Sequence, residues 1–190
     1  DLRSMVIAGQ MIEYFEEQYL FYNSLTDEIR DNLRIRLYGE DYEWSQRQRW
    51  IDRFSSVKFD TNNKIEKSIN HARLVISTYS GTIHNTTLAS NIPTIIYWNT
   101  EHWELNDESW PYFKELTRVG IFHKNSQSAA NHIVNIWNNI DKWWNEPELQ
   151  RVREEYCRAF AHKSKNLVKN LGKILVNEKN EYDRRESIHK

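Results

Sequence analysis

The chain has 190 residues, a length that fits one globular domain, and 39% of them are hydrophobic, which is enough for a packed core. The formal net charge of −1 argues against a broad basic surface for nucleic acid or for an anionic membrane. With 5 Gly and 3 Pro against 8 Trp, 10 Tyr and 7 Phe, the composition disfavours an all-β fold and predicts a core rich in aromatic rings.

Two further features of the composition bear on location. No apolar run approaches the roughly 20 residues that a membrane-spanning helix needs, so we expect no membrane span. The single cysteine, Cys157, leaves no internal disulfide and no cysteine-based zinc site, and it favours a reducing, cytoplasmic setting. The chain begins at Asp1 rather than Met and carries no signal peptide, so we expect it to be a fragment of a longer protein.

The first part of the chain contains both helical and strand patterns. Apolar residues recur at helical spacing over 5–22 and predict a helix there. Thr26, followed by two acidic residues, has the properties of an N-cap and predicts a short second helix. The segment over 33–38 alternates apolar and basic residues, as a strand does. Further elements are predicted as helices over 45–54 and about 62–71 and a short strand over 57–59.

Buried strands and helices alternate in the rest of the chain. The segments over 74–78 and 92–98 are apolar and rich in β-branched residues, which is typical of buried parallel strands. Spacing predicts the other elements, namely helices over 82–90, 110–116, 126–144, 147–161 and 163–176 and an extended piece over 120–122. The order predicts an α/β fold: a Rossmann-like open parallel sheet with helices on both faces and a helical C-terminal extension. We expect one domain over 1–176 and a charged, disordered tail over 177–190.

The sharpest functional signal is the turn after the predicted strand over 74–78. Ligands of open parallel sheets bind at the carboxyl ends of the strands, and unpaired N–H groups at a helix N-terminus attract anions. Gly81 would let a phosphate approach the backbone, and four hydroxyl groups could donate hydrogen bonds to it, those of Ser77, Thr78, Ser80 and Thr82. The turn is therefore a candidate phosphate site, and the alternative is an ordinary helix cap. It is neither a P-loop nor a dinucleotide fingerprint, because GK[ST] and GxGxxG are both absent.

Two other loops follow predicted strands. Arg36 lies near the end of its strand, where its guanidinium could reach a phosphate or form a surface ion pair. The second loop offers groups that could stack on a base, hold a ribose or move a proton, namely Asn99, Glu101, His102, Trp103 and Glu104. The alternative is that its tryptophans, with Trp98, fill the domain edge. The cluster lacks HExxH spacing, so we expect no metal.

Several other residues have a chemical and a structural interpretation. His84 and Asn85 fall in the first turn of the helix after Gly81 and could face the same cleft. Cys157 is interpreted as a core thiol. The tryptophans of the C-terminal helices fit helix packing better than a ligand platform, at positions Trp137, Trp143 and Trp144.

Several segments together resemble a bacterial surface-carbohydrate transferase family. They are Leu74–Thr82, Leu88–Ile95, Trp98–Leu105, Gly120–His123 and Trp143–Asn145. That family is similar to GT-B glycosyltransferases, in which two Rossmann-like domains face each other across a cleft and the C-terminal one binds the nucleotide-sugar donor. The resemblance implies that residues 1–176 form this nucleotide-sugar-binding domain and that an N-terminal domain completes the enzyme.

The resemblance also implies roles for particular residues. Ser77, Thr78, Ser80, Gly81 and Thr82 would bind the donor phosphate. Arg36 would assist them, although this chain has no His-Pro pair at the corresponding strand end, as some relatives do. Thr86 stands where the family has a Glu, so a ribose contact by that Glu is not carried over. The turn resembles those of enzymes that use CMP-activated nonulosonic acids, which weakly favours a CMP-sugar.

The expected function is the donor-binding half of an inverting, metal-independent glycosyltransferase in bacterial surface-carbohydrate biosynthesis. Its partners would be a nucleotide sugar and a carbohydrate acceptor, and it would need no cofactor. Two alternatives stay open. One is a non-catalytic nucleotide- or sugar-binding module, and the other is a glycerol-phosphate-type transferase domain, which shares the fold and a similar turn.

Overall fold

Three short parallel strands form the central sheet. The computed structural model describes residues 8–161, 166 and 168–177. The strands are β1 (Val75–Ser77), β2 (Thr94–Tyr97) and β3 (Phe122–His123), in the order β1-β2-β3. Ile76 pairs with Ile95, which fixes the register of the first two strands. The predicted α/β fold with a parallel sheet and helices around it is confirmed.

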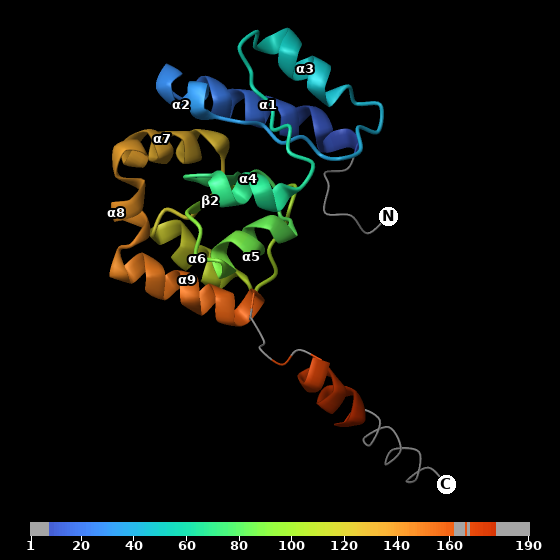
Figure 1. Cartoon of the computed structure of the whole chain (residues 1–190), viewed down its shortest axis with the longest axis vertical. Coiled ribbons are helices and arrows are strands. Elements are labelled where there is room, and N and C mark those ends of the chain that lie inside the picture. Colours follow the sequence, from blue (N-terminus) through green and yellow to red (C-terminus); the bar gives the residue numbers. More distant parts are fainter. Residues whose placement is uncertain (1–7, 162–165, 167, 178–190) are drawn as a thin grey trace.

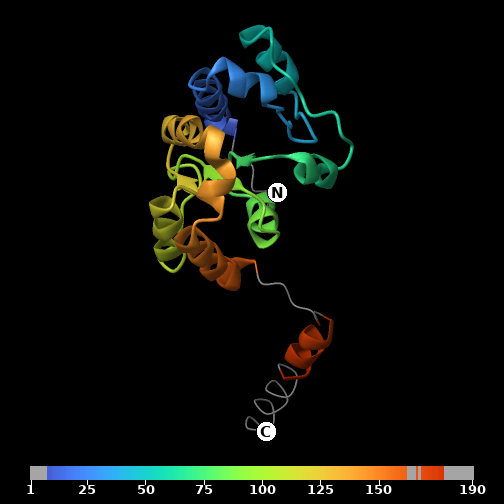
Figure 2. The same cartoon turned by 60° about the vertical axis from the view of Figure 1, so that its left-hand side comes forward.

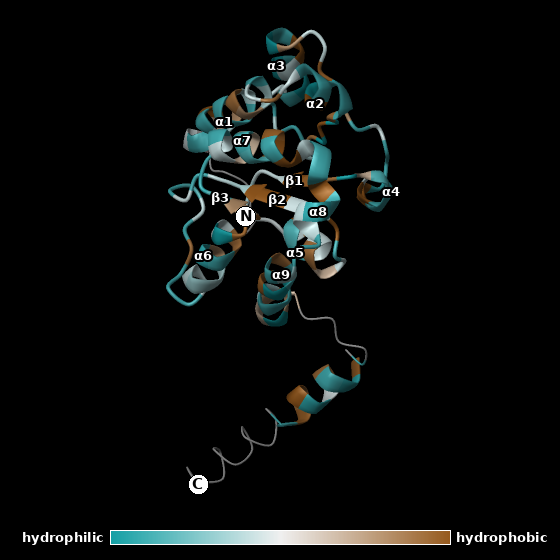
Figure 3. Ribbon diagram, turned by 90° about the vertical axis from the view of Figure 1, so that its left-hand side faces the viewer, coloured by the Kyte–Doolittle hydropathy of each residue, from teal (hydrophilic) through white to brown (hydrophobic). Residues whose placement is uncertain are grey.

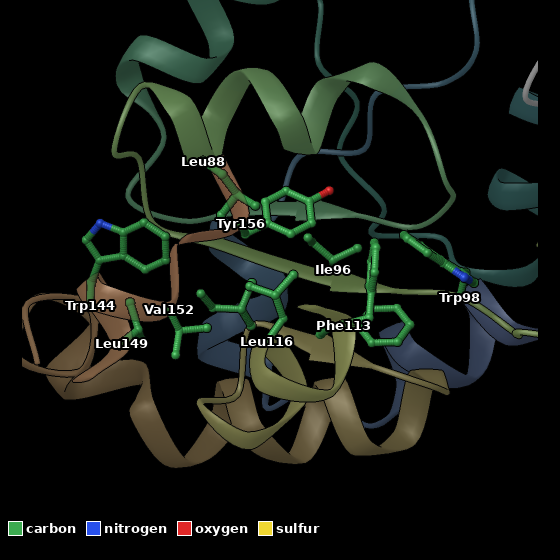
Figure 4. Packing of buried hydrophobic residues seen from close by; sticks show 11 residues of the cluster. Leu88, Ile96, Trp98, Phe113, Leu116, Trp144, Leu149, Val152 and Tyr156 are labelled. Carbon is green, nitrogen blue, oxygen red and sulfur yellow. The ribbon is translucent and has the colours of Figure 1, made fainter. Parts of the chain in front are cut away.

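Helices cover both faces of this sheet (Figure 1). Ile96 faces a core cluster that it shares with α5 (Thr82–Ala89), α6 (Trp110–Arg118), α8 (Ile140–Trp144) and α9 (Pro147–Phe160). Figure 4 shows this cluster, in which Leu88, Leu116 and Trp144 converge on the strand. Ile95 and Tyr97 point to the opposite face, as the two-residue period of a strand requires, and contact α1 (Met11–Asn23), α2 (Asp27–Asn32) and α7 (Ser126–Ile136).

Helix α1 is buried on two sides. Phe21 belongs to the cluster on the sheet. The opposite side of the helix forms a separate aromatic cluster in which Tyr19 meets Trp50 edge-on, with ring centroids 4.9 Å apart. Trp50 lies on α3 (Gln46–Arg53), and Figures 1 and 2 show α3 on the far side of α1 from the sheet. Helix α1 therefore separates the sheet from α3.

The prediction of a sheet strand over 33–38 is wrong, because this segment forms no strand of the central sheet. Only Ile35 pairs there, in a single parallel bridge with Phe59. The alternating apolar side chains of 33–37 pack instead into the aromatic cluster beside α1 and α3. The alternating apolar residues of this segment therefore belong to a small separate core, and the bridge between Ile35 and Phe59 is not part of the three-stranded sheet.

The long helix expected over 126–144 is broken. Helix α7 ends at Ile136, a 3₁₀ turn follows over Trp137–Asn139, and α8 begins at Ile140. Two successive asparagines, which favour helices weakly, lie at this break. The break lets the chain pass around the sheet edge, because α7 packs on one face and Trp144 of α8 on the other.

Other elements follow the predictions closely. Thr26 caps α2, with its hydroxyl accepting the N–H of Ile29, and α4 spans Ile65–His71. A C-terminal helix covers 168–177, so the first residues of the helix expected over 163–176 and all but one residue of the tail expected over 177–190 lie outside the described part of the chain. No helix within the described ranges is long and apolar enough to cross a membrane.

Candidate functional site

The turn after β1 leaves an uncapped helix N-terminus. Gly81 is the N-cap residue of α5 and makes no side-chain cap, and no other side chain in the described ranges accepts a hydrogen bond from the first turn. Ser77 donates its hydroxyl to the carbonyl of Tyr79 at 3.2 Å. Among the described residues the hydroxyls of Ser80 and Thr82 have no partner. The first-turn N–H groups and these two hydroxyls are thus free to donate to an anion, which is the arrangement that binds phosphate.

Gly81 is required here by an aromatic ring. A Cβ at this position would lie 2.5 Å from Cε2 of Tyr79, so any side chain would push the ring away. The ring of Tyr79 also lies near Trp103, with centroids 6.2 Å apart, and Trp103 meets Tyr14 edge-on at 5.7 Å. Burial raises the pKa of Tyr79, as does the nearby Tyr38. Three aromatic side chains from α1, the turn and the next loop therefore meet at the carboxyl end of the sheet.

Helix α1 runs across the carboxyl ends of all three strands. Oε2 of Glu13 lies 2.9 Å from Nε2 of His102, in the loop after β2. The hydroxyls of Tyr14 and Thr78 share a hydrogen bond of 2.7 Å after β1. Glu17 accepts the N–H of Ser126 at 3.1 Å, after β3. One helix face thus supplies a hydrogen-bond partner to each carboxyl-end loop, and two of these partners are carboxylates.

The loop after β2 divides into a buried and an exposed part. The side chain of His102 is only 6% exposed beneath Glu13. Asn99 accepts the N–H of Glu101 and so shapes the turn, while the carboxylates of Glu101 and Glu104 are exposed. The structure therefore brings His102 and Trp103 to the turn after β1, through α1 and Tyr79.

Trp98 is a core residue. Its side chain is 1% exposed and packs on the rings of Phe113 and Phe122. Figure 4 shows it beside Phe113 in the core cluster, so it fills the interior and offers no stacking platform to a ligand. It has the same strand parity as Ile96, so the two-residue period of β2 directs it into the interior.

A family model with the description LIC12162 family transferase matches residues 1–175. The chain belongs to this transferase family. The matched range contains the turn after β1, the loop after β2 and helix α1, so all the residues that meet at the carboxyl end of the sheet lie inside it. Comparisons with curated proteins and with solved structures found no match.

His84 and Asn85 of this LIC12162 transferase face the C-terminal helices. His84 is buried between Trp98 and Tyr156, and burial lowers its pKa to about 4. Asn85 accepts a hydrogen bond of 2.8 Å from the hydroxyl of Tyr156. Their contacts lie in the packing of α5 on α9, and neither touches Thr78, Tyr79 or Trp103 in the contacts described.

Two more contacts hold α5 from its other end. The buried guanidinium of Arg153 on α9 donates to the carbonyl of Leu88 at 2.8 Å. The indole N–H of Trp144 donates to the side chain of Asn91, which follows α5 with a φ of 56°. Helices α8 and α9 therefore anchor the helix whose N-terminus forms the turn.

Arg36 is held by a different network. Its guanidinium lies 2.6 Å from Oδ2 of Asp60 and also donates to the carbonyl of Asn62. Burial raises the pKa of Asp60, but hydrogen bonds from Ser68, Asn62 and Arg36 outweigh it and lower the value to about 2. The guanidinium of Arg36 is therefore paired with Asp60, and the structure does not bring Arg36 to the turn after β1.

The sequence did not single out Glu13, Tyr14 or Glu17. The sequence feature that could have found these three residues is their helical spacing, which places them on one side of α1, between its two apolar faces.

A groove of about 630 Å³ runs between α1 and α7, lined mainly by amides and serines such as Ser126, and it contains none of the predicted site residues. No group of three or more His, Cys, Asp or Glu in the described ranges is arranged to hold a metal ion.

Proposed function

We propose that this transferase is the donor-binding half of an inverting, metal-independent glycosyltransferase that uses a nucleotide sugar in bacterial surface-carbohydrate biosynthesis. The family match supports transfer chemistry. The observation that carries the proposal is the uncapped N-terminus of α5 with the unpartnered hydroxyls of Ser80 and Thr82, at the carboxyl end of a parallel sheet.

The chemistry would be a direct displacement at the anomeric carbon. An acceptor hydroxyl attacks this carbon, the bond from carbon to the phosphate oxygen breaks, and the electron pair leaves on the phosphate. The N–H groups of the α5 N-terminus and the hydroxyls of Ser80 and Thr82 stabilise this developing charge. We assign the general base that takes the acceptor proton to a second domain facing this one.

Helix α1 competes with such a ligand in this proposal. The carboxylate of Glu13 is hydrogen-bonded to Nε2 of His102, and the hydroxyl of Tyr14 is hydrogen-bonded to that of Thr78, so neither Nε2 nor the Thr78 hydroxyl is free for a ligand. A bound phosphate would exchange with these partners, and the negative charge of Glu13 would oppose it. Removing that charge in Glu13→Gln should raise nucleotide affinity about fivefold, because an interaction between two partly exposed charges, here the repulsion between carboxylate and phosphate, contributes up to about 1 kcal/mol. Glu17→Gln removes the same charge one helical turn away and is the matched control.

The proposal is tested by nucleotide binding. We would first screen CMP, UDP, GDP and CDP-glycerol by thermal shift and then measure the affinity of the best ligand by calorimetry. Ser80→Ala and Thr82→Val should each weaken binding roughly tenfold or more, since a hydrogen bond to a charged group contributes about 1.5–3 kcal/mol. Thr86→Val is the matched control, because Thr86 is exposed on the same helix and donates only to a backbone carbonyl.

The outcomes separate the alternatives. Equal affinity of the Thr82→Val and Thr86→Val variants would refute the phosphate site. No shift with any nucleotide would contradict the donor-binding role and favour a structural module. A response to CDP-glycerol alone would favour a glycerol-phosphate-type transferase.

A further inference from the structure

The helix over 168–177 exposes an apolar face. Its large apolar side chains are 49–85% exposed, namely Val168, Leu171, Ile174, Leu175 and Val176. Figure 3 shows this helix apart from the sheet and its covering helices, with hydrophobic and hydrophilic residues both present along it. Elsewhere in the described part of the chain, exposed large apolar residues are scattered, apart from the contacting pair Tyr112 and Phe160, which is normal for a folded domain; here five gather on one short helix.

The rest of the helix is polar and basic. At 100° per residue, Lys169, Lys173, Asn170 and Asn177 fall together on one side, and the apolar residues occupy the remaining arc. The sequence over 156–177 contains five basic residues and no acidic one, although the whole chain has a net charge of −1. The balanced composition of the chain therefore conceals a local basic amphipathic segment.

The size of the face argues against a second copy of this chain as its partner. A stable protein interface buries about 800 Å² on each side and uses about 20–30 residues. A coiled coil needs an apolar repeat over at least three to four heptads. A ten-residue helix provides a small fraction of either.

The charge pattern fits a negatively charged bilayer surface. Helices that lie in a membrane interface carry an apolar face that enters the acyl boundary and a polar face rich in lysine that meets the anionic headgroups. Lysine stems can extend along the apolar boundary while the ammonium groups stay in water. We propose that the helix over 168–177 binds the surface of anionic lipid bilayers, with its apolar residues inserted and Lys169 and Lys173 at the headgroups. This inference goes beyond the proposed function and does not depend on it.

The test is co-sedimentation of the whole chain with lipid vesicles. We expect it to bind vesicles that mix phosphatidylglycerol with phosphatidylcholine, to bind pure phosphatidylcholine much more weakly, and to dissociate as salt is raised. Each lysine near an anionic surface contributes about fivefold to partitioning, so Lys169→Gln/Lys173→Gln should lower the partition coefficient about thirtyfold. Lys64→Gln/Lys67→Gln removes two exposed lysines at the start of α4, one of them its N-cap residue, and should have little effect.

A second variant tests insertion. Leu171→Ser/Leu175→Ser should also abolish sedimentation while leaving the melting temperature unchanged, because both side chains are exposed. Failure of the wild-type chain to bind anionic vesicles would overturn the proposal, as would equal loss in the two lysine variants. A dimer in light scattering that Leu171→Ser/Leu175→Ser dissociates, without vesicle binding by the wild type, would assign the face to a second copy and overturn the proposal too.

Discussion

Two buried histidines should make the fold sensitive to mild acid. His84 and His123 are 4% and 7% exposed. Burial lowers the pKa of both to about 4; for His123 the carbonyl of Gly120 opposes this effect and the neighbouring His132 adds to it. Above pH 6.5, the ordinary value, both are neutral whether the chain is folded or unfolded. As the pH falls below it, the unfolded chain takes up protons that the folded chain does not, so the free energy of unfolding falls.

The magnitude follows from the two pKa values. At about pH 5, a histidine with a folded pKa of about 4 and an unfolded pKa of 6.5 loses about 2 kcal/mol of stability relative to neutral pH, so the pair loses about 4 kcal/mol. The lowered pKa of Asp60 acts in a separate window, because stability from a depressed carboxyl is lost only as the pH falls from 3.8 through about 2.

The assay is urea unfolding, followed by tryptophan fluorescence, at about pH 7.5 and about pH 5. His84→Phe removes a titrating ring whose Nδ1 has no partner among the described residues, so it should reduce the loss caused by acid by about 2 kcal/mol. His71→Gln, at an exposed position, should leave the loss unchanged. An unfolding free energy that is the same at both pH values, or an undiminished loss in His84→Phe, would refute the reasoning.

Three further substitutions test the packing. Gly120→Ala should cost about 2 kcal/mol or more, because φ is +79° and the new Cβ would lie 2.6 Å from the His132 ring; an unchanged urea midpoint would contradict the need for glycine. Leu116→Ala should cost about 2–5 kcal/mol in urea unfolding, since the side chain is fully buried, and a loss below about 1 kcal/mol would place it outside the core. Asp60→Asn should cost about 1–3 kcal/mol by weakening its charge-assisted bond with Arg36, and an equal cost of Asp60→Asn in the wild type and in the Arg36→Ala background would show that the pair is not coupled.

The sheet could be predicted because its strands are buried on both faces. The segments around β1 and β2 are continuous apolar runs, and helices on both sides are the partners that such runs need. The position of the turn after β1 could be predicted for the same reason, since this turn joins a buried strand directly to a helix. The interior position of Trp98 could also be predicted, because Trp98 and Ile96 lie two residues apart in the strand predicted over 92–98 and so face the same side. The polar residues that follow Trp98 obscure this pattern in the sequence.

The position of α1 could not be predicted. The helix has apolar residues on two sides, and nothing in the sequence states that Phe21 meets the sheet while Tyr19 meets Trp50. The placement of Arg36 depends on that choice, because α1 separates its segment from the sheet. Long-range partners of this kind are set by the shapes of assembled elements and leave no local pattern.

The anchoring of α5 by the C-terminal helices has a consequence for local unfolding. The N-terminus of α5 forms the turn, and its other end is tied to α8 and α9 through Trp144 and Arg153. Breaking these contacts would leave Nη1 of Arg153 and the indole N–H of Trp144 without their acceptors, which is costly in a buried setting. The amides of α5 should therefore exchange with solvent together with those of α9, as one cooperative unit. Rigidity at the turn is thus supplied by residues about sixty positions further along the chain.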